Sequence, residues 1–225
     1  TIINLYIFFM KKKTDISQIR FKYKTGLLDI KNSDKNPFKQ FNKWMQEAIK
    51  NKVFEPTAMS LSTTSSKKKI SNRVVLLKGV ENDGFVFYTN LNSQKSREIS
   101  KNNYVAAVFW WPQIGKQVRI EGKTILVNNK VADEYFATRS KKSQIGAWAS
   151  NQSTFLKDKK TLFQRFKIVE KRFEKKDVTR PKFWSGYIIK PVLIEFWQGR
   201  ENRLHDRIVY KKHKSKKWKR YRLNP

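Results

Sequence analysis

Two arginines and one of the chain's two histidines lie within five residues near the C-terminus, as Arg203, His205 and Arg207. An aromatic pair, Phe196 and Trp197, comes a few positions earlier. A guanidinium group binds anionic oxygens through paired N–H donors, and an imidazole can donate or accept a hydrogen bond near neutral pH. The pattern has two interpretations, a solvated basic hairpin or a site for a ligand that is both anionic and aromatic.

A second set of polar residues, Tyr135, Arg139 and Ser143, recurs at roughly one helical turn. This spacing would bring a phenol, a guanidinium and a hydroxyl together, and such a trio suits a phosphate monoester. The stretch "SQIGAWAS", residues 143–150, carries no charge in a very basic chain. We therefore expect it to be buried or to face a ligand.

A third set lies where a strand is expected to give way to a short helix, with Tyr88, Thr89, Ser93 and Lys95. A helix N-terminus with a hydroxyl cap, here Ser93, and a nearby lysine is a ready anion site. A capped helix that faces solvent would show the same pattern, so both interpretations stay open.

The elements that must position these residues are mostly strands. From Thr57 to Val127, five short runs rich in β-branched and aromatic residues follow one another, separated by polar or glycine-containing turns. Asn82-Asp83-Gly84 is a strong hairpin signal. The run "RVVLLK" is expected to hold Arg73 and Lys78 at either end of one strand. The pattern predicts an antiparallel sheet closed into a barrel.

Helical periodicity predicts an amphipathic helix over 37–51, capped by Asn36, and two later helices around 129–140 and 158–176. The C-terminal part indicates two or three further strands, the last pair forming a hairpin around 214–217. No repeat or linker is evident. The fold class predicted is one domain that is mainly β, with flanking helices.

Composition excludes several kinds of site. The chain has 225 residues, 39% of them hydrophobic, with no cysteine and two histidines, so disulfides and thiolate chemistry are excluded and no metal site is expected. The net charge of +32 raises a nucleic-acid-binding barrel as an alternative. Most lysines are scattered along the chain, so a solvated basic surface is the simpler interpretation.

The first residues, "TIINLYIFFM", resemble a short signal or anchor, but no basic residue precedes the apolar run and it is too short to span a bilayer. Our hypothesis is that Met10 is the natural start and that residues 1–9 are upstream translation. We expect a disordered extension over 1–19, a single domain over 20–225, and a soluble cytoplasmic protein.

Six stretches, "RVVLLK", "FYTNLNSQK", "SQIGAWAS", "FWSGY", "IEFWQG" and "RLHDR", resemble in order and spacing the pyridoxine/pyridoxamine 5'-phosphate oxidase family. The resemblance runs from about Arg20 to Pro225. It implies an FMN-binding split β-barrel, antiparallel and Greek-key-like, that works as a homodimer with FMN at the subunit interface. It also implies oxidation of pyridoxine and pyridoxamine 5'-phosphate to pyridoxal 5'-phosphate, with hydride transfer to FMN and reoxidation by oxygen to give hydrogen peroxide.

The resemblance further implies roles for individual residues. The positions that match FMN contacts are Arg73, Val74, Val75, Leu76, Leu77, Lys78, Tyr88, Thr89, Gln94, Lys95, Gln117, Gln152, Ser153, Trp197 and Arg207. The positions that match substrate contacts are Arg20, Tyr23, Lys78, Tyr135, Arg139, Ser143, Arg203 and His205. Of these, Arg203 and His205 are implied to be catalytic and to lie over the pyridine ring, and some FMN contacts are implied to come from the partner subunit.

One position departs from the family pattern. Gln94 stands where the family usually has an arginine directly before the lysine that matches Lys95. Loss of a guanidinium at the FMN phosphate is expected to weaken FMN binding, and Arg97 is the candidate to replace it. Two further alternatives stay open: a related flavoprotein with another substrate, and an inactive relative that binds pyridoxal phosphate.

Overall fold

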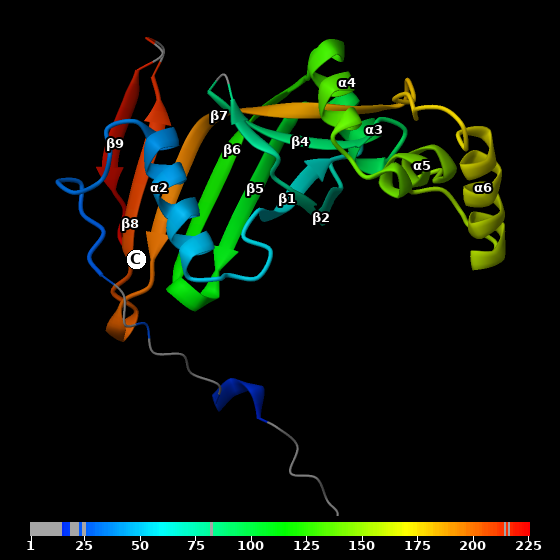
Figure 1. The fold of residues 1–225 in the computed structure, drawn as a ribbon. Coiled ribbons are helices and arrows are strands. Elements are labelled where there is room, and N and C mark those ends of the chain that lie inside the picture. The colour runs from blue at the N-terminus through cyan, green and yellow to red at the C-terminus, as the bar shows by residue number, and fades with distance from the viewer. Residues whose placement is uncertain (1–14, 19–22, 24–25, 82, 214, 216) are drawn as a thin grey trace, which may run out of the picture.

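The computed structural model describes residues 15–18, 23, 26–81, 83–213, 215 and 217–225. Within this part, nine strands form one sheet in which every pairing is antiparallel (Figure 1). The strands are β1 (Ala58–Thr64), β2 (Ile70–Leu76), β3 (Gly79–Glu81), β4 (Gly84–Asn90), β5 (Tyr104–Trp111), β6 (Lys116–Leu126), β7 (Trp184–Gln198), β8 (Asp206–Lys212) and β9 (Trp218–Arg222).

The strand order is β2-β1-β5-β6-β7-β4-β3, with β8 on β7 and β9 on β8. No ladder joins the two end strands, β2 and β3, within the described ranges. The sheet therefore curls without closing, which confirms the split barrel and corrects the expectation of a closed one. The pairing of β8 with β9 confirms the C-terminal hairpin, although Lys214 and Lys216 of its turn lie outside the described residues.

The long strand β7 connects the two ends of the sheet. Its first half pairs with β4 and its last part pairs with β8, while β6 runs along most of its length. The β6–β7 register shifts between Glu121 and Gly122, opposite Pro191. Proline has no N–H to give to a ladder, so a bulge relieves the mismatch. A Cβ on Gly122 would lie 2.3 Å from the carbonyl oxygen of Lys190, so only glycine fits there.

The predicted hairpin at Asn82-Asp83-Gly84 is confirmed, since β3 pairs with β4 from Gly79 opposite Val86 to Glu81 opposite Gly84, although Asn82 itself is not described. The single strand expected over "RVVLLK" is wrong, because β2 ends at Leu76. The Leu77 N–H donates to the carbonyl of Thr57, and the Lys78 N–H donates to that of Val86. The chain thus changes partner strand between these residues.

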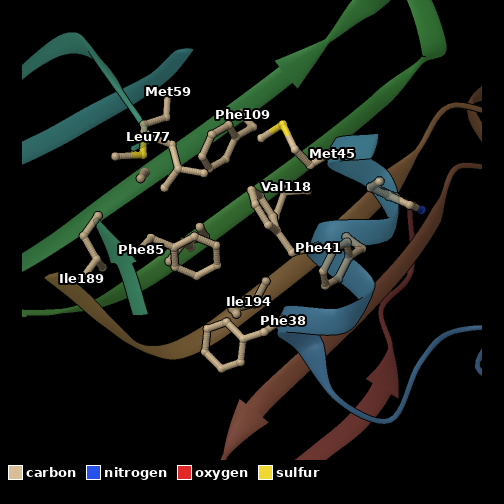
Figure 2. Close-up of a cluster of buried hydrophobic side chains, with 14 of the residues drawn as sticks. Phe38, Phe41, Met45, Met59, Leu77, Phe85, Phe109, Val118, Ile189 and Ile194 are labelled. Atoms are coloured by element: carbon tan, nitrogen blue, oxygen red, sulfur yellow. The ribbon is translucent and has the colours of Figure 1, made fainter. Parts of the chain in front are cut away.

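Helix α2 (Pro37–Lys50) covers one face of the sheet. The side chain of Asn36 accepts hydrogen bonds from the N–H groups of Phe38 and Lys39, which confirms the predicted cap. Phe38 and Phe41 project from α2 onto the sheet residues Phe85 and Phe109 (Figure 2). Full burial of one such ring stabilises the fold by about 1.5–3 kcal/mol.

Four more helices of the described residues lie toward the end of the sheet away from β8 and β9 (Figure 1). They are α3 (Gln94–Lys101), α4 (Asn129–Ala137), α5 (Lys141–Ala149) and α6 (Lys159–Arg172). The helix expected around 129–140 is confirmed as α4, although α4 ends at Ala137. A separate helix α5 begins after Ser140, whose hydroxyl accepts from the Ser143 N–H. The helix expected over 158–176 is shorter at both ends. Three short 3-10 helices are η2 (Ile16–Gln18), η3 (Pro112–Ile114) and η4 (Glu201–Arg203).

No helix in the described part of the chain is long and apolar enough to cross a membrane. The division into an extension over 1–19 and one domain over 20–225 stays a prediction, because most of the first 25 residues lie outside the described ranges.

Candidate active site

A cavity of about 480 Å³ lies between β2, β4, α5 and the start of β7. Its volume is within the range of ordinary small-molecule sites. It brings together many residues predicted from the sequence to contact cofactor or substrate. Those that line it are Val74, Val75, Leu76, Lys78, Tyr88, Thr89, Lys95, Tyr135, Arg139, Ser143 and Gln152.

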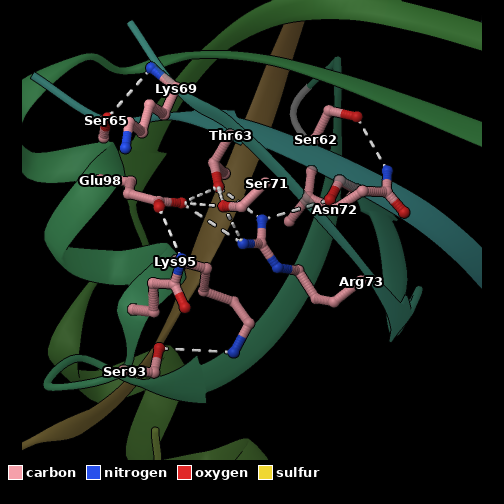
Figure 3. Close-up of polar contacts among 12 residues, drawn as sticks. Ser62, Thr63, Ser65, Lys69, Ser71, Asn72, Arg73, Ser93, Lys95 and Glu98 are labelled. Atoms are coloured by element: carbon pink, nitrogen blue, oxygen red, sulfur yellow. Dashed lines mark hydrogen bonds and ion pairs between the residues drawn. The ribbon is translucent and has the colours of Figure 1, made fainter. Parts of the chain in front are cut away.

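The ammonium group of Lys95 is a buried cation in this cavity. Its Nζ lies 3.1 Å from the hydroxyl oxygen of Thr89. It also lies 3.4 Å from the hydroxyl oxygen of Ser93 (Figure 3). No carboxylate of the described residues pairs with it. Burial lowers the pKa of Lys95, and the charge of Arg73 lowers it further. A buried cation without a counter-charge favours an anionic ligand.

Ser93 stands at the N-cap position of α3, as expected, but its side chain does not cap the helix. Its hydroxyl lies 3.2 Å from that of Ser96. The structure therefore corrects the predicted capping role: this hydroxyl supports Lys95 and the first turn of α3.

Arg139 is a second cation at the cavity wall, and its side chain is half-buried. It lies in the connection between α4 and α5, and its Cζ stands 4.8 Å from the ring centre of Trp184 and 5.5 Å from that of Phe136. Its Nη1 is buried and has no hydrogen-bond partner in the described part of the protein. Burial lowers the pKa of Arg139. An unsatisfied guanidinium nitrogen at a cavity wall is a donor in need of an acceptor.

Three aromatic rings line the same cavity in nearly parallel planes. Tyr88 and Tyr135 stack with ring centres 3.9 Å apart, and Tyr88 and Trp184 with ring centres 5.3 Å apart. Burial, followed by the nearby charge of Glu81, raises the pKa of Tyr88 to about 12. Burial also raises the pKa of Tyr135. Both phenols are therefore protonated at neutral pH and can donate hydrogen bonds.

Three predicted cofactor contacts, Arg73, Leu77 and Gln94, do not line the cavity. Leu77 is buried in the core. The Arg73 guanidinium forms an ion pair with Glu98, at 3.3 Å (Figure 3). Gln94 Nε2 donates to the same carboxylate at 2.9 Å. The guanidinium of Arg97 donates to the carbonyl of Asn92, so it does not take the place of the missing arginine.

Glu98 anchors this network. Its burial alone would raise its pKa, but hydrogen bonds from Ser71, Thr63 and Gln94, together with the charge of Arg73, hold the pKa at about 2. The carboxylate therefore stays ionised throughout the physiological range and neutralises Arg73. Lys95 and Arg139 are left as cavity cations that have no ion-pair partner among the described residues.

A second group of predicted residues gathers at the far end of β7. The rings of Trp197 and His205 have centres 4.6 Å apart, and Tyr23 meets both edge-on, at 5.6 and 5.9 Å. Gln117 and Arg207 flank Trp197 on the neighbouring strands. We call these five residues the aromatic end.

Two polar side chains of the aromatic end, His205 and Arg207, have hydrogen-bond partners. His205 Nδ1 accepts from the N–H of Arg200 at 3.0 Å, so the neutral ring carries its proton on Nε2. Burial, and then the charge of Arg203, lower the pKa of His205. Arg207 Nε donates to the buried carboxylate of Glu195 at 2.7 Å.

Arg203 itself has a left-handed backbone. Its φ is 60°, and that of Asn202 is 55°. Such residues are uncommon outside glycine and are concentrated at functional sites. Asp206 forms ion pairs with Arg200, at 3.7 Å, and with Arg222, at 3.6 Å.

The cavity and the aromatic end are far apart in one chain. Trp184 begins β7 and Trp197 lies 13 positions later in the same strand. A strand rises about 3.3 Å per residue, so they are separated by up to about 43 Å along the strand. Figure 1 shows α5 and β8 at opposite ends of the sheet. Of the remaining predicted contacts, Ser153 is exposed with a φ of 65°, and Arg20 lies outside the described residues.

Five cavity-lining residues were assigned no role from the sequence: Asn90, Gly146, Ala147, Ser150 and Trp184. Three of them belong to "SQIGAWAS", where the lack of charge was the signal, and that stretch does line the cavity as expected. Asn90 and Trp184 lie inside two of the quoted family motifs. Nothing local marks Trp184 as a cavity residue, because its neighbours there come from β4, α4 and the α4–α5 connection.

The comparisons with known proteins agree with this geometry. Residues 45–176 match the family model described as pyridoxamine 5'-phosphate oxidase. Residues 184–225 match the model described as the pyridoxine 5'-phosphate oxidase C-terminal dimerisation region. Most of the cavity lies in the first range, and Trp197 to Arg207 lie in the second.

Curated relatives and solved structures extend the match to nearly the whole chain. A pyridoxine/pyridoxamine 5'-phosphate oxidase of Rubrobacter xylanophilus is 45% identical over 95% of this chain and 98% of its own length. One from Haemophilus influenzae is 44% identical over 94% and 100%. The crystal structure of PhzG from Burkholderia lata, in complex with tetrahydrophenazine-1-carboxylic acid, has a TM-score of 0.84 and 27% identity, covering 89% of this chain and 99% of that one. The chain belongs to the pyridoxine/pyridoxamine 5'-phosphate oxidase family.

Proposed function

We propose that this protein oxidises pyridoxine 5'-phosphate and pyridoxamine 5'-phosphate to pyridoxal 5'-phosphate, with FMN as cofactor and oxygen as the electron acceptor. The observation that carries the proposal is a pair of cations in one cavity, the buried Lys95 and the half-buried Arg139, neither of which has an ion-pair partner among the described residues. Two phosphate groups, one on the cofactor and one on the substrate, would match them. The names of the curated relatives support this assignment.

The residues present fit FMN. Lys95, with the hydroxyl of Thr89 beside it, would hold the FMN phosphate at the start of α3. Val74 on β2 is an apolar side chain that is 66% exposed at the cavity, as expected for a surface that a flat ring covers. When bound, FMN supplies a two-electron acceptor that oxygen can reoxidise, giving hydrogen peroxide.

The substrate phosphate would lie against Arg139, Tyr135 and Ser143. The free Nη1 of Arg139 can donate a charge-assisted hydrogen bond, and the Tyr135 phenol stays protonated and can donate a second. Ser140 donates its hydroxyl proton to Ser143 Oγ at 2.8 Å, so the Ser143 hydroxyl can point its own proton toward a ligand. Lys78, at the cavity wall, would reach both ligands.

The remaining contacts would come from a second copy of the chain. The aromatic end is too far from the cavity of its own chain, and it lies within the range that matches a dimerisation region. In a two-fold homodimer, the cavity of each subunit would meet the aromatic end of its partner. Each dimer would then hold two identical composite sites.

At such a site the chain's own residues would orient the substrate ring for oxidation. The alcohol loses a hydride from carbon and a proton from oxygen; the amine loses the same pair from carbon and nitrogen, and water then releases ammonia. His205 presents an N–H on Nε2, because Nδ1 already accepts from Arg200, so it would donate a hydrogen bond to the ring. Arg203 would add a positive charge beside it.

The test is an absorption spectrum of the purified protein, before and after pyridoxine 5'-phosphate is added in air-saturated buffer. A bound flavin and the appearance of the aldehyde product are expected. A flavin spectrum without turnover of either substrate would point to another substrate or to an inactive relative. Colourless protein that stays inactive with added FMN would overturn the proposal, and salt-dependent binding to nucleic acid would then be tested.

A further inference from the structure

Arg139 differs from Arg73 and Arg207, two other arginines at the predicted ligand positions, in how it is held. Arg73 is paired with Glu98, and Arg207 is paired with Glu195. Both carboxylates are buried. Arg139 forms no ion pair with any described carboxylate, and its nearest supports are the faces of two aromatic rings.

Trp184, the closer of these rings, is itself firmly placed. Its side chain is only 7% exposed, and its ring is parallel to that of Tyr88 within 6°. Its backbone N–H donates to the carbonyl of Pro181 at 2.9 Å, and its own carbonyl accepts from Arg180 Nη1 at 2.7 Å. The indole is thus fixed from both the backbone and the ring side.

We propose that Trp184 is a positioning residue for the substrate phosphate: its indole face holds the Arg139 guanidinium at the cavity wall without neutralising it. This inference rests on the proposed function, because it takes Arg139 as the phosphate ligand. A carboxylate partner would orient the guanidinium equally well, but it would also compete with the phosphate for the same N–H donors. An aromatic face attracts the cation and leaves its in-plane N–H groups free.

The same stack extends the effect to a second phosphate ligand. Tyr135 is parallel to Trp184 within 5°, and Tyr88 stacks on both rings. Trp184 therefore supports the phenol and the guanidinium that would grip the phosphate, whereas Lys95 is held separately by hydroxyl groups. Loss of the indole should weaken recognition of the substrate phosphate and leave the cofactor phosphate unaffected.

The main experiment compares Trp184→Leu and Trp184→Phe with the wild-type holoenzyme. For each protein, the KM and kcat for pyridoxine 5'-phosphate would be measured, with the Kd values of pyridoxal 5'-phosphate, pyridoxal and FMN. Trp184→Leu should raise the KM and the Kd of pyridoxal 5'-phosphate about tenfold. The Kd values of pyridoxal and FMN, and kcat at saturation, should stay close to wild type. Trp184→Phe, which keeps a ring, should lie between the two.

Two controls separate positioning from a general loss of packing. Phe173→Leu truncates another ring of the same buried cluster, one that contacts Trp148 instead of Arg139, and should leave phosphate recognition intact. In an Arg139→Met background, Trp184→Leu should have little further effect on the Kd of pyridoxal 5'-phosphate, because its influence acts through the guanidinium.

Equal weakening of pyridoxal and pyridoxal 5'-phosphate, or an undiminished effect in the Arg139→Met background, would overturn the inference. So would a Trp184→Leu protein that binds pyridoxal 5'-phosphate as wild type does. The binding comparison does not need turnover. If the wild-type protein binds pyridoxal 5'-phosphate but oxidises neither substrate, the proposed function fails while Trp184 can still be judged.

Discussion

The cavity and the aromatic end use arginine in opposite ways. In the cavity, Arg139 rests on aromatic rings and keeps a buried donor unsatisfied. At the aromatic end, Arg207 is paired with the buried Glu195, and His205 is engaged through Nδ1 by the backbone of Arg200. The first region carries free charge within a concave wall, which suits phosphates. The second region offers ring faces and a few directed N–H groups. These groups suit contact with the face of a flat ligand whose phosphate is bound in the cavity.

The largest expected effect tests whether the two regions complete each other across subunits. One variant would remove the cavity cations (Lys95→Met with Arg139→Met), and another would remove rings of the aromatic end (Trp197→Ala with His205→Ala). Each homodimer should be inactive. A heterodimer, co-expressed with two tags and purified through both, should recover roughly half of the wild-type activity, because one of its two composite sites contains no substitution.

The control for that experiment is a dimer in which both subunits carry the same variant, one with each tag. This dimer should stay inactive. If both regions served one site within a single chain, every site in the mixed dimer would carry one defect. An inactive mixed dimer that binds as a stable pair would therefore contradict the composite site.

The next effect concerns the cavity alone. Lys95→Met removes a buried cation and should raise the Kd of FMN by roughly 10- to 100-fold, since a hydrogen bond to a charged group contributes about 1.5–3 kcal/mol. Flavin fluorescence during titration into the apoprotein measures this directly. Lys101→Met, at the exposed end of the same helix, is the matched control. Equal Kd values for both variants would place the phosphate away from α3.

The next effect concerns the stability that the Glu98 carboxylate, the partner of Arg73, gives to the fold. Arg139 has no such carboxylate partner among the described residues. The pKa of Glu98 is about 2 in the folded protein, against an ordinary value of 4.5. Its ionised form therefore stabilises the fold fully above about pH 4.5, and this contribution is lost as the pH falls from 4.5 toward 2. Glu98→Gln should lower the free energy of unfolding by about 2–3 kcal/mol at pH 7, and by much less at pH 3.

Urea unfolding of the apoprotein at both pH values would measure this difference. Glu134→Gln removes an exposed carboxylate from α4 and should change stability little at either pH. A Glu98→Gln protein whose deficit is the same at pH 3 as at pH 7 would show that the carboxylate does not titrate as its hydrogen bonds indicate.

The smallest expected effect is that of Gln94→Arg. An added guanidinium near Lys95 should tighten FMN binding, but Gln94 now donates to Glu98, and an arginine there would be drawn to the same carboxylate. We therefore expect only a two- to fivefold decrease in the Kd of FMN, roughly the effect of an exposed charge pair. Unchanged or weaker affinity would count against any role for this position at the phosphate.

Local sequence patterns are sufficient to predict features that depend only on residues close together in the chain. The cap at Asn36, the hairpin at Asn82-Asp83-Gly84 and the uncharged stretch 143–150 each follow from neighbours along the chain, and the structure places each as expected. The spacing of Tyr135, Arg139 and Ser143 predicts a helix, yet Arg139 lies between two helices. All three still line one cavity, because a tight connection and a helical turn bring side chains at this spacing to the same side.

The sequence by itself determined the family, the curled antiparallel sheet and the set of residues suited to phosphate and ring recognition. Only the tertiary structure decided that Arg73 is neutralised by Glu98, that Arg139 is supported by Trp184, and that one long strand holds the cavity and the aromatic end apart. The physical reason is separation along the chain: Trp184 lies 45 positions from Arg139, and Glu98 lies 25 from Arg73. Such contacts depend on how strands pair and where helices end, and no local spacing specifies either.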